Sequence, residues 1–485
     1  MSIRITIVGL GPGDPGLITR EAWATLESAP AVYLRTRQHP GLDALPPGPE
    51  YHSFDALYEQ HASFEDVYAE IARQVVALAR EESGVVYAVP GDPSMGETTV
   101  RLIVDQAQAA ELPVRLVAGV SFLEPTCHTL GCDPFDGLQI CDGTLLAQRL
   151  HPPLDPDVPA LIVQVYNRQM AADIKMTLLG LYPDEHLIRL VLHAGLASQS
   201  LREMPLYELD RQDDLDHLSS VYVPPMPAPS SLSSYQEVMA RLRAPNGCPW
   251  DREQTHESLR GSLLEETYEV LEALDEGDMA SLCEELGDLL LQILFHAQIA
   301  TENGDFRLVD SMGHAIEKLI RRHPHVFAEE EAEDAQAVLL SWEQIKREER
   351  GEQAEAFTSM LASISTALPA LAQALAIQHR VARVGFDWPA VDGVVTKLKE
   401  EIDEFAQAPD EASRAAELGD LLFSLVNLAR WYDIDPESAL REANLRFRRR
   451  FGHIEADAHR KGMALEEMSM SEMDELWEQA KSDET

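Results

Sequence analysis

Positive charge is scarce in this chain. Its 485 residues include 39 Lys and Arg against 83 Asp and Glu, a formal net charge of −44. Such a charge repels a nucleic-acid backbone and an anionic membrane surface, so neither is expected as the main partner. The acidity is not a terminal tail, because residues 231–485 hold 52 acidic and 25 basic residues, a net −27, and the rest carries −17.

Cysteine and long apolar runs are scarce as well. The five cysteines are odd in number and show no Cys-x-x-Cys spacing, which indicates reduced thiols rather than a disulfide framework or a zinc site. No apolar run approaches the length that spans a membrane, and residues 1–8 resemble a strand rather than a signal peptide. We therefore expect a cytoplasmic protein of two or three domains.

Prolines concentrate at one point, which predicts a domain boundary. Four prolines and several serines lie within residues 224–234, a composition typical of an extended linker. Before it, helical patterns alternate with short buried strands, which predicts an α/β domain over residues 1–223 with a largely parallel sheet. The predicted strands are residues 3–8, 85–89, 114–117, 160–165 and 187–192.

After the linker, apolar stripes at helical spacing dominate and strand signals almost vanish. We expect an all-α region in two tandem modules, residues 235–350 and 351–485. The division lies at the acidic stretch 329–334 and the polar stretch 346–355. The chain is thus predicted to be multidomain, with an α/β part followed by helical modules.

A short acidic pattern occurs once in each helical module. Glu-Glu-x-x-Glu at 265–269 precedes Glu-Leu-Gly-Asp at 285–288, and the same order returns at 400–404 and 417–420. On a helix, positions i, i+3 and i+4 share a face, so carboxylates of two helices can face each other. They repel unless a cation lies among them, and all-oxygen ligands suit Mg²⁺ or Mn²⁺. The expected metal ligands are Glu265, Glu266, Glu269, Glu285 and Asp288 in the first copy and Glu400, Glu401, Glu404, Glu417 and Asp420 in the second.

The alternative for each acidic motif is a solvated helix face. The apolar neighbours argue against it, because Leu263, Leu264 and Tyr268 surround the first motif and residues 289–295 are mostly apolar. Carboxylates in such surroundings are costly unless they are paired or bind metal. The duplication of the whole arrangement also favours a metal site.

Three Gly-rich turns follow predicted strands of the first domain, at residues 9–15, 90–96 and 118–121. Ligands of open α/β sheets bind at such carboxyl ends. The turns resemble those of the tetrapyrrole methylase family over about residues 1–225, which implies a two-lobed domain that binds S-adenosylmethionine. By this resemblance the cofactor site comprises Gly11, Gly91, Asp92, Pro93, Met95, Ser121 and Phe122. The methyl acceptor stays open, because Ala118 and residues 94–98 depart from the family pattern.

The helical half carries further motifs in a fixed order. Asn-Gly-Cys-Pro-Trp-Asp at 246–251 precedes Gln-Thr-His at 254–256, and Arg-Arg-His-Pro-His-Val-Phe occupies 321–327. The second module has Val-Gly-Phe-Asp-Trp at 384–388 and Asn-Leu-Arg-Phe at 444–447. Together with the acidic motifs, they resemble the MazG family of nucleoside triphosphate pyrophosphohydrolases over nearly all of residues 235–485. The fusion to a methylase-like domain resembles bacterial proteins of the YabN type.

This resemblance implies hydrolysis of NTP or dNTP to NMP and pyrophosphate. Carboxylates cannot bind a triphosphate directly, so one or two Mg²⁺ ions must bridge them, and a Glu outside the ligand set could be the general base. The five acids of the first copy are the expected catalytic residues. The expected substrate contacts are Trp250, Lys318, Arg321, Arg322, Asn444, Arg446 and Arg449.

Several of these residues have a structural role as the alternative to a functional one. The basic runs can complement a helix C-terminus instead of binding phosphate. Trp250 and Trp388 can stack on a base, although packing in a core is the favoured role. His323 and His325 lack a third ligand for zinc and are expected to cap or pack.

The leading hypothesis is a Mg²⁺-dependent nucleoside triphosphate pyrophosphohydrolase that forms a homodimer, because helix pairs commonly need a partner to complete a four-helix unit. Two alternatives stay open: an S-adenosylmethionine-dependent methyltransferase with a helical dimerisation half, and a nucleotide-sensing module without turnover. Both acidic copies keep all five positions, and which copy is active stays open. By the family resemblance, one module of a tandem pair can concentrate the activity. The second lacks the Cys-Pro-Trp-Asp element and the first lacks the Asn-x-Arg-Phe element, so we expect unequal activity.

Overall fold

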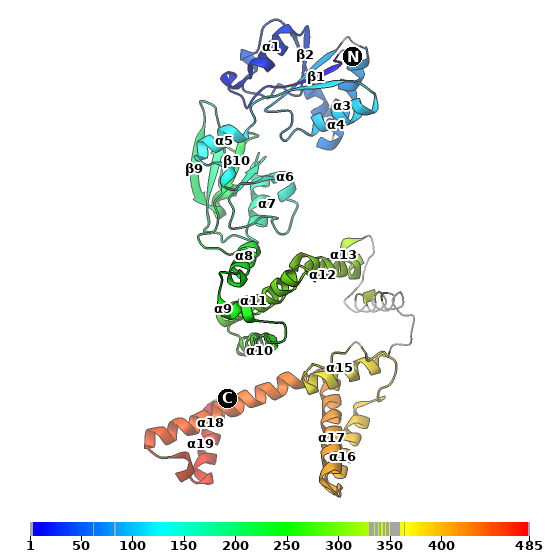
Figure 1. The fold of residues 1–485 in the computed structure, drawn as a ribbon, viewed down its shortest axis with the longest axis vertical. Coiled ribbons are helices and arrows are strands. Elements are labelled where there is room, and N and C mark those ends of the chain that lie inside the picture. Colours follow the sequence, from blue (N-terminus) through cyan, green and yellow to red (C-terminus); the bar gives the residue numbers. More distant parts are fainter. Residues whose placement is uncertain are drawn as a thin grey trace. The chain divides into compact units, whose positions relative to one another are not determined.

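The computed structural model describes residues 3–61, 63–81, 84–328, 334, 338, 341–342, 345, 349, 359–362 and 364–483. Contacts within the chain divide it into two units, Met1–Glu253 and Gln254–Thr485. Figure 1 shows their helices and strands. The first unit therefore includes two helices, α8 (Leu232–Arg243) and α9 (Pro249–Glu253), that lie beyond the prolines where the sequence predicts the boundary. None of the described helices is long and apolar enough to cross a membrane.

The first lobe is built on a five-stranded parallel sheet of order β3-β2-β4-β1-β5. Its strands are β1 (Ile5–Gly9), β2 (Ala31–Leu34), β3 (Glu50–Ser53), β4 (Val85–Val89) and β5 (Val114–Val117). Its helices are α1 (Arg20–Ser28), α2 (Asp55–Gln60), α3 (Phe64–Glu81) and α4 (Thr98–Ala109), with 3₁₀ turns η1 (Pro15–Leu17) and η2 (Leu42–Ala44).

Helices cover both faces of this sheet, which explains the largely apolar sequences of its central strands β1 and β4. Ile5 and Ile7 of β1 pack in one core with side chains of α3 and α4. Val8, on the opposite face, packs with Ala22 and Leu26 of α1. The sequence prediction is confirmed for β4 and β5, residue for residue.

The second lobe has a mixed sheet of order β6-β7-β10-β8-β9. Its strands are β6 (Gln139–Asp142), β7 (Ala160–Val163), β8 (Leu187–Leu192), β9 (Ser200–Pro205) and β10 (Ser219–Val223). Its helices are α5 (Leu123–Leu130), α6 (Gly143–Leu146) and α7 (Arg168–Leu178), with η3 (Pro134–Asp136) and η4 (Leu206–Arg211). Only β6 and β7 pair in parallel here, so the predicted largely parallel sheet holds for the first lobe alone.

The proline-rich segment is bound to the first unit rather than free. Asp157 accepts hydrogen bonds from the backbone N–H groups of Ser230 (2.8 Å) and Ser231 (3.0 Å). A hydrogen bond from the Ser234 side chain, together with these backbone bonds, holds the pKa of Asp157 well below its usual range. Ser231 in turn is the N-cap of α8, because its hydroxyl accepts from the Ser234 N–H. The end of the segment and the start of α8 are therefore fixed together.

The second unit is helical throughout its described residues, as the sequence predicts. Its first part contains α10 (Arg260–Glu276), α11 (Met279–Asn303), α12 (Leu308–Arg322) and α13 (Pro324–Phe327). Its second part contains α15 (Ala370–Ala382), α16 (Val391–Gln407), α17 (Glu411–Trp431), α18 (Pro436–Lys461), η5 (Leu465–Glu467) and α19 (Met470–Asp483). Helix α10 packs along α11, and α16 packs along α17 in the same way.

The carboxyl edge of the first sheet is closed by contacts between glycine backbones, which makes a testable prediction. A Cβ on Gly119 would lie 2.2 Å from the Gly91 carbonyl oxygen. Gly119→Ala should therefore destabilise the first unit by about 3 kcal/mol, the upper part of the overpacking range. Scanning calorimetry of the full chain measures this. Gly48→Ala, where a Cβ meets nothing within 4 Å, is the control, and equal unfolding temperatures of the two variants would contradict the prediction.

Candidate active site and metal centres

The three Gly-rich turns of the first unit meet at the carboxyl edge of the parallel sheet. Gly11 and Gly91 exchange backbone hydrogen bonds of 3.1 and 2.8 Å, and both have positive φ. The Asp92 carboxylate accepts from the Gly119 N–H at 3.0 Å, which ties the second turn to the third. Burial opposes ionisation of Asp92, but the bonds from Ser94 and Gly119 outweigh it and lower its pKa.

The other predicted cofactor residues continue from these turns. Pro93 is buried and Met95 half-buried in the loop after Asp92. Ser121 is buried, and its hydroxyl donates to Glu124 at 2.5 Å. Phe122 packs against the core between α5 and the second sheet. Asp92 thus binds the second turn to the third, whereas Ser121 bonds within its own segment.

In the helical unit, a tight turn brings together the two acidic motifs of the first module, residues 265–269 and 285–288. Helix α10 ends at Gly277, whose φ of 70° suits glycine, and the Asp278 side chain caps α11 by accepting from the Ala280 and Ser281 N–H groups. In such a helical hairpin, residues at equal distances from the turn lie opposite each other. Glu266 lies 11 residues before Gly277 and Asp288 lies 10 residues after Asp278, so they face each other.

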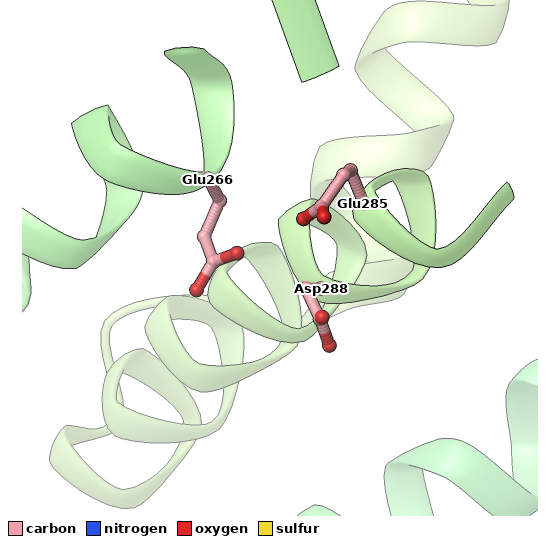
Figure 2. Close-up of side chains that lie close together, drawn as sticks. All are labelled: Glu266, Glu285 and Asp288. Carbon is pink, nitrogen blue, oxygen red and sulfur yellow. The ribbon is translucent and has the colours of Figure 1, made fainter. Parts of the chain in front are cut away.

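Three carboxylates form the centre of this hairpin. Glu266 of α10 and Glu285 and Asp288 of α11 each offer an oxygen within 4.8 Å of the others (Figure 2). All three are half-buried. We call them the first triad. Of the five acids predicted for this copy, Glu269 lies next to the triad, and Glu265 is exposed and is not grouped with it.

Among the described residues, the charges that act most strongly on the first triad are negative. Burial, followed by the charges of Asp288 and Glu269, raises the pKa of Glu266. Burial, followed by the charges of Glu269 and Asp288, also raises the pKa of Glu285. A divalent cation would relieve this repulsion, and three carboxylates are a suitable donor set for Mg²⁺ or Mn²⁺.

The second module repeats the arrangement. Glu401 of α16 and Glu417 and Asp420 of α17 also lie within 4.8 Å of one another through one oxygen each, and we call them the second triad. Glu401 is 4% exposed, and its Oε2 has no hydrogen-bond partner among the described residues. Burial and then the charge of Glu404 raise the pKa of Glu417. Glu404 therefore occupies the same place beside the second triad as Glu269 beside the first: each is an acid outside the triad whose charge raises the pKa of a triad member.

A lysine distinguishes the two triads. Lys397 Nζ lies 2.7 Å from Glu401 and 2.9 Å from Glu400, one turn earlier on α16. The residue one turn before Glu266 is Ser262. In the first triad, Glu266 instead accepts a long hydrogen bond, 3.4 Å, from the Gln292 amide. Neither Lys397 nor Gln292 is among the residues that the sequence predicts for the site, although both lie four residues from a motif acid.

The ion pairs shown for the predicted phosphate-binding residues Arg321, Arg322 and Arg446 are with acids outside the triads. Arg322 and Arg321 at the end of α12 both pair with Glu349 at 2.7 Å and hold its pKa at about 2. Lys318, Asn444, Arg446 and Arg449 are exposed, and Arg446 reaches Glu442 at 3.5 Å. Their role as substrate contacts stays a prediction.

The structure contradicts the assignments of the two tryptophans and confirms that of His323. Trp250 and Trp388 are 61% and 45% exposed, so the favoured assignment as core aromatics is wrong for both. They lie on a short helix and a loop, where the chain provides too little cover to bury an indole. The expectation for His323 is confirmed: it is the C-cap residue of α12, and its Nδ1 bonds the Leu319 carbonyl at 2.7 Å.

Comparisons with known proteins agree with both halves of this architecture. The family model "MazG nucleotide pyrophosphohydrolase domain" matches residues 254–327, and "Tetrapyrrole (Corrin/Porphyrin) Methylases" matches residues 4–210. The YabN protein of Bacillus subtilis, described as uncharacterized, is 42% identical over 100% of this chain and 99% of its own length.

Two shorter relatives match the helical half. The nucleoside triphosphate pyrophosphohydrolase/pyrophosphatase MazG of Thermotoga maritima and the nucleoside triphosphate pyrophosphohydrolase of Escherichia coli K12 are each 47% identical over 51% of this chain and 95% of their own lengths. Among solved structures, uroporphyrin-III-C-methyltransferase from Thermus thermophilus aligns with 46% of this chain and 93% of its own at 23% identity and a TM-score of 0.37, which adds nothing to the family match.

A methylase-type α/β domain and helical hairpins with facing carboxylates thus define a two-part protein. The chain belongs to the MazG nucleotide pyrophosphohydrolase family, in the form that carries an N-terminal tetrapyrrole methylase domain. The MazG match covers the first triad, and the second triad lies outside the matched residues.

Metal binding should require Glu266 but not its neighbour Glu265. Glu266→Gln should remove Mn²⁺ binding at the first triad, about a hundredfold loss, whereas the exposed Glu265→Gln should leave it within about twofold. Because the pKa of Glu266 and Glu285 is raised, protonation should displace the metal at a higher pH than for an ordinary carboxylate. Calorimetric Mn²⁺ titration of the full chain between pH 5 and 8 measures both effects, and equal losses for the two variants would contradict this assignment.

Lys397 should weaken metal binding at the second triad, because its ammonium repels a cation at Glu401. Lys397→Gln should therefore raise the Mn²⁺ affinity of that site about threefold to tenfold in the absence of nucleotide. Lys399→Gln on the same helix is the control. An unchanged or weaker affinity for Lys397→Gln would show that the lysine does not compete with the metal.

Proposed function

We propose that the chain is a Mg²⁺-dependent nucleoside triphosphate pyrophosphohydrolase that converts NTP or dNTP to NMP and pyrophosphate. The observation that carries the proposal is the first triad, three mutually repelling carboxylates on facing helices. The names of the Thermotoga maritima and Escherichia coli relatives support the substrate class. The first triad is proposed as the principal active centre, since Lys397 already neutralises part of the second.

The reaction adds water across one phosphoanhydride bond. A new bond forms between the water oxygen and the α-phosphorus, the α–β bridging bond breaks, and pyrophosphate leaves with the bridging oxygen. Mg²⁺ held by Glu266, Glu285 and Asp288 would neutralise phosphate charge that the carboxylates would otherwise repel. Each carboxylate of the triad therefore serves to bind the cation and to fix its place between α10 and α11.

The proton of the attacking water needs an acceptor close to the metal ligands. Glu269 is one turn from Glu266 on α10, and its charge acts on both Glu266 and Glu285. It is not a member of the triad, so it keeps its lone pairs available. We assign Glu269 as the general base.

A homodimer is proposed because the hairpins leave apolar side chains uncovered. Leu264 and Tyr268 on α10 are 55% and 43% exposed, and α12 and α17 also expose large apolar residues. A Cβ added to Gly287 or Gly419, the glycines of the repeated acidic motif, would meet nothing within 4 Å. A glycine in the middle of a helix lowers helix stability by about 1 kcal/mol relative to alanine. A second molecule packed against these positions would explain why glycine is present there. A second copy that completes a four-helix unit is such an occupant.

S-Adenosylmethionine is the proposed ligand of the first unit. The tetrapyrrole methylase match and the meeting of three Gly-rich turns at the carboxyl edge of the parallel sheet support it. The Asp92 and Ser121 side chains are occupied within the loops, so we expect the cofactor to bind mainly to backbone groups. Both proposed substrates are cytoplasmic metabolites, and we expect the protein in that compartment.

Pyrophosphate release from a panel of NTPs and dNTPs with Mg²⁺ tests the proposal. Glu266→Ala should lower turnover about a hundredfold or more, and Glu401→Ala should lower it much less. Glu265→Ala and Glu400→Ala are the matched controls. No pyrophosphate from the wild type, under conditions where nucleotide binds, would favour a sensing module. Equal losses for Glu266→Ala and Glu401→Ala would refute the first triad as the principal centre.

A further inference from the structure

Polar side chains continue along α11 beyond the first triad. Gln292 and His296 follow Asp288 at successive steps of four residues, so all three lie on one face of the helix. Each step advances about 6 Å along the axis. This polar stripe therefore runs away from the triad over about the length of a nucleoside, through a part of α11 whose other residues are largely apolar.

Gln292 is a buried amide with half of its hydrogen-bonding capacity unused. Its side chain belongs to a residue only 5% exposed, and its Nε2 donates to the Glu266 carboxylate of the triad. Its Oε1 is buried and has no hydrogen-bond partner among the described residues. A buried acceptor without a donor costs about 1–3 kcal/mol, so a ligand that supplies the donor would recover that free energy.

His296 presents a second buried atom of this kind. Its Nδ1 lies 2.8 Å from the Nδ1 of His256, and the two rings are parallel to within 1°. One of these nitrogens must donate and the other accept, which fixes the plane of the His296 ring. Its Nε2 is buried without a hydrogen-bond partner in the described part of the chain. Depending on which histidine donates, this Nε2 is either a donor or an acceptor.

The opposite direction from the triad does not suit a nucleotide. It leads to the turn between α10 and α11, where Asp275 pairs with Arg441 at 2.6 Å and the acids Glu276 and Asp278 are exposed. These would repel a phosphate chain. Within the described α10–α11 hairpin, the buried side-chain atoms without a hydrogen-bond partner belong to Gln292 and His296, on the other side of the triad.

The second module does not repeat the polar stripe. Counting from Asp420 as from Asp288, the matching positions on α17 hold Ser424 and Leu428. The acidic motifs are thus duplicated, whereas the stripe beside them occurs only in the module that the MazG match covers. A role confined to metal binding would not require this difference, because both triads have the same acids.

We propose that Gln292 and His296 contact the nucleoside part of the substrate in the first module, with His256 positioning His296. They would bind a hydrogen-bonding group of the sugar or of the base edge while the triad binds the phosphates through metal. Gln292 Oε1 accepts only, so it selects a hydroxyl or N–H donor. This proposal rests on the proposed function for its substrate class and adds the specificity determinants to it.

Calorimetry with Mg²⁺ and two kinds of probe tests this subsite in the full-length protein. One probe set is non-hydrolysable α,β-methylene triphosphates with four bases and both sugars, and the other is inorganic tripolyphosphate, which lacks a nucleoside. Gln292→Leu and His296→Phe should each weaken nucleotide binding about threefold to tenfold, by a factor that varies with base or sugar. Tripolyphosphate binding should stay within about twofold, which also reports that each variant is folded. Ser424→Ala in the second module is the matched control and should change neither probe.

Two results would overturn the subsite. If Gln292→Leu weakens the binding of tripolyphosphate and of nucleotides equally, Gln292 only positions Glu266. If both variants bind nucleotides as the wild type does, the polar stripe does not contact the nucleoside. A failure of the proposed hydrolytic function can be distinguished from a failure of this subsite. If the wild type binds nucleotides by way of Gln292 and His296 but releases no pyrophosphate, the subsite stands and hydrolysis does not.

Discussion

Repulsion between carboxylates on facing helices is the constraint on which the helical half depends. The Gly277–Asp278 turn holds α10 against α11 at a spacing that places Glu266 opposite Asp288. This arrangement opposes folding in the absence of a cation, because burial and mutual repulsion both raise the pKa of Glu266 and Glu285. Apolar packing along the hairpin must offset that cost. The electrostatic cost of the hairpin is greatest when no cation lies among the three carboxylates.

The two modules meet the same constraint in different ways. At the second triad, Lys397 brings a positive charge within 2.7 Å of Glu401. At the first, the neutral amide of Gln292 makes one weak contact with Glu266, and no described lysine or arginine forms an ion pair with the triad. Duplication thus preserved the acids, while the residues around them diverged. The chemistry of each copy depends on those neighbours as much as on the repeated motif.

Much of the fold could be predicted from the sequence, because burial on both sides gives β4 a continuous apolar strand and the acidic motifs mark facing helices. The edge strand β5 was recognised from its valines, although Arg115 and Leu116 are exposed. The second sheet was harder, since β9 and β10 are antiparallel and carry polar residues that weaken the strand pattern. Within the site, spacing along one helix identified the acids but not the side chains that face them across the hairpin. Gln292 and the His256–His296 pair depend on that tertiary placement. Trp250 and Trp388 were predicted to be buried because they are aromatic, but both are exposed, which also depends on tertiary placement.

The lysine beside the second triad has a consequence for how the chain takes up metal. One binding site fills over about two decades of free cation concentration, and a tenfold difference in affinity between two sites corresponds to about 1.4 kcal/mol. A chain whose second triad already holds an ammonium, and whose first triad has no such ion pair among the described residues, would load its sites in sequence. Its metal content would then vary gradually with the free Mg²⁺ of its surroundings instead of switching at a single threshold.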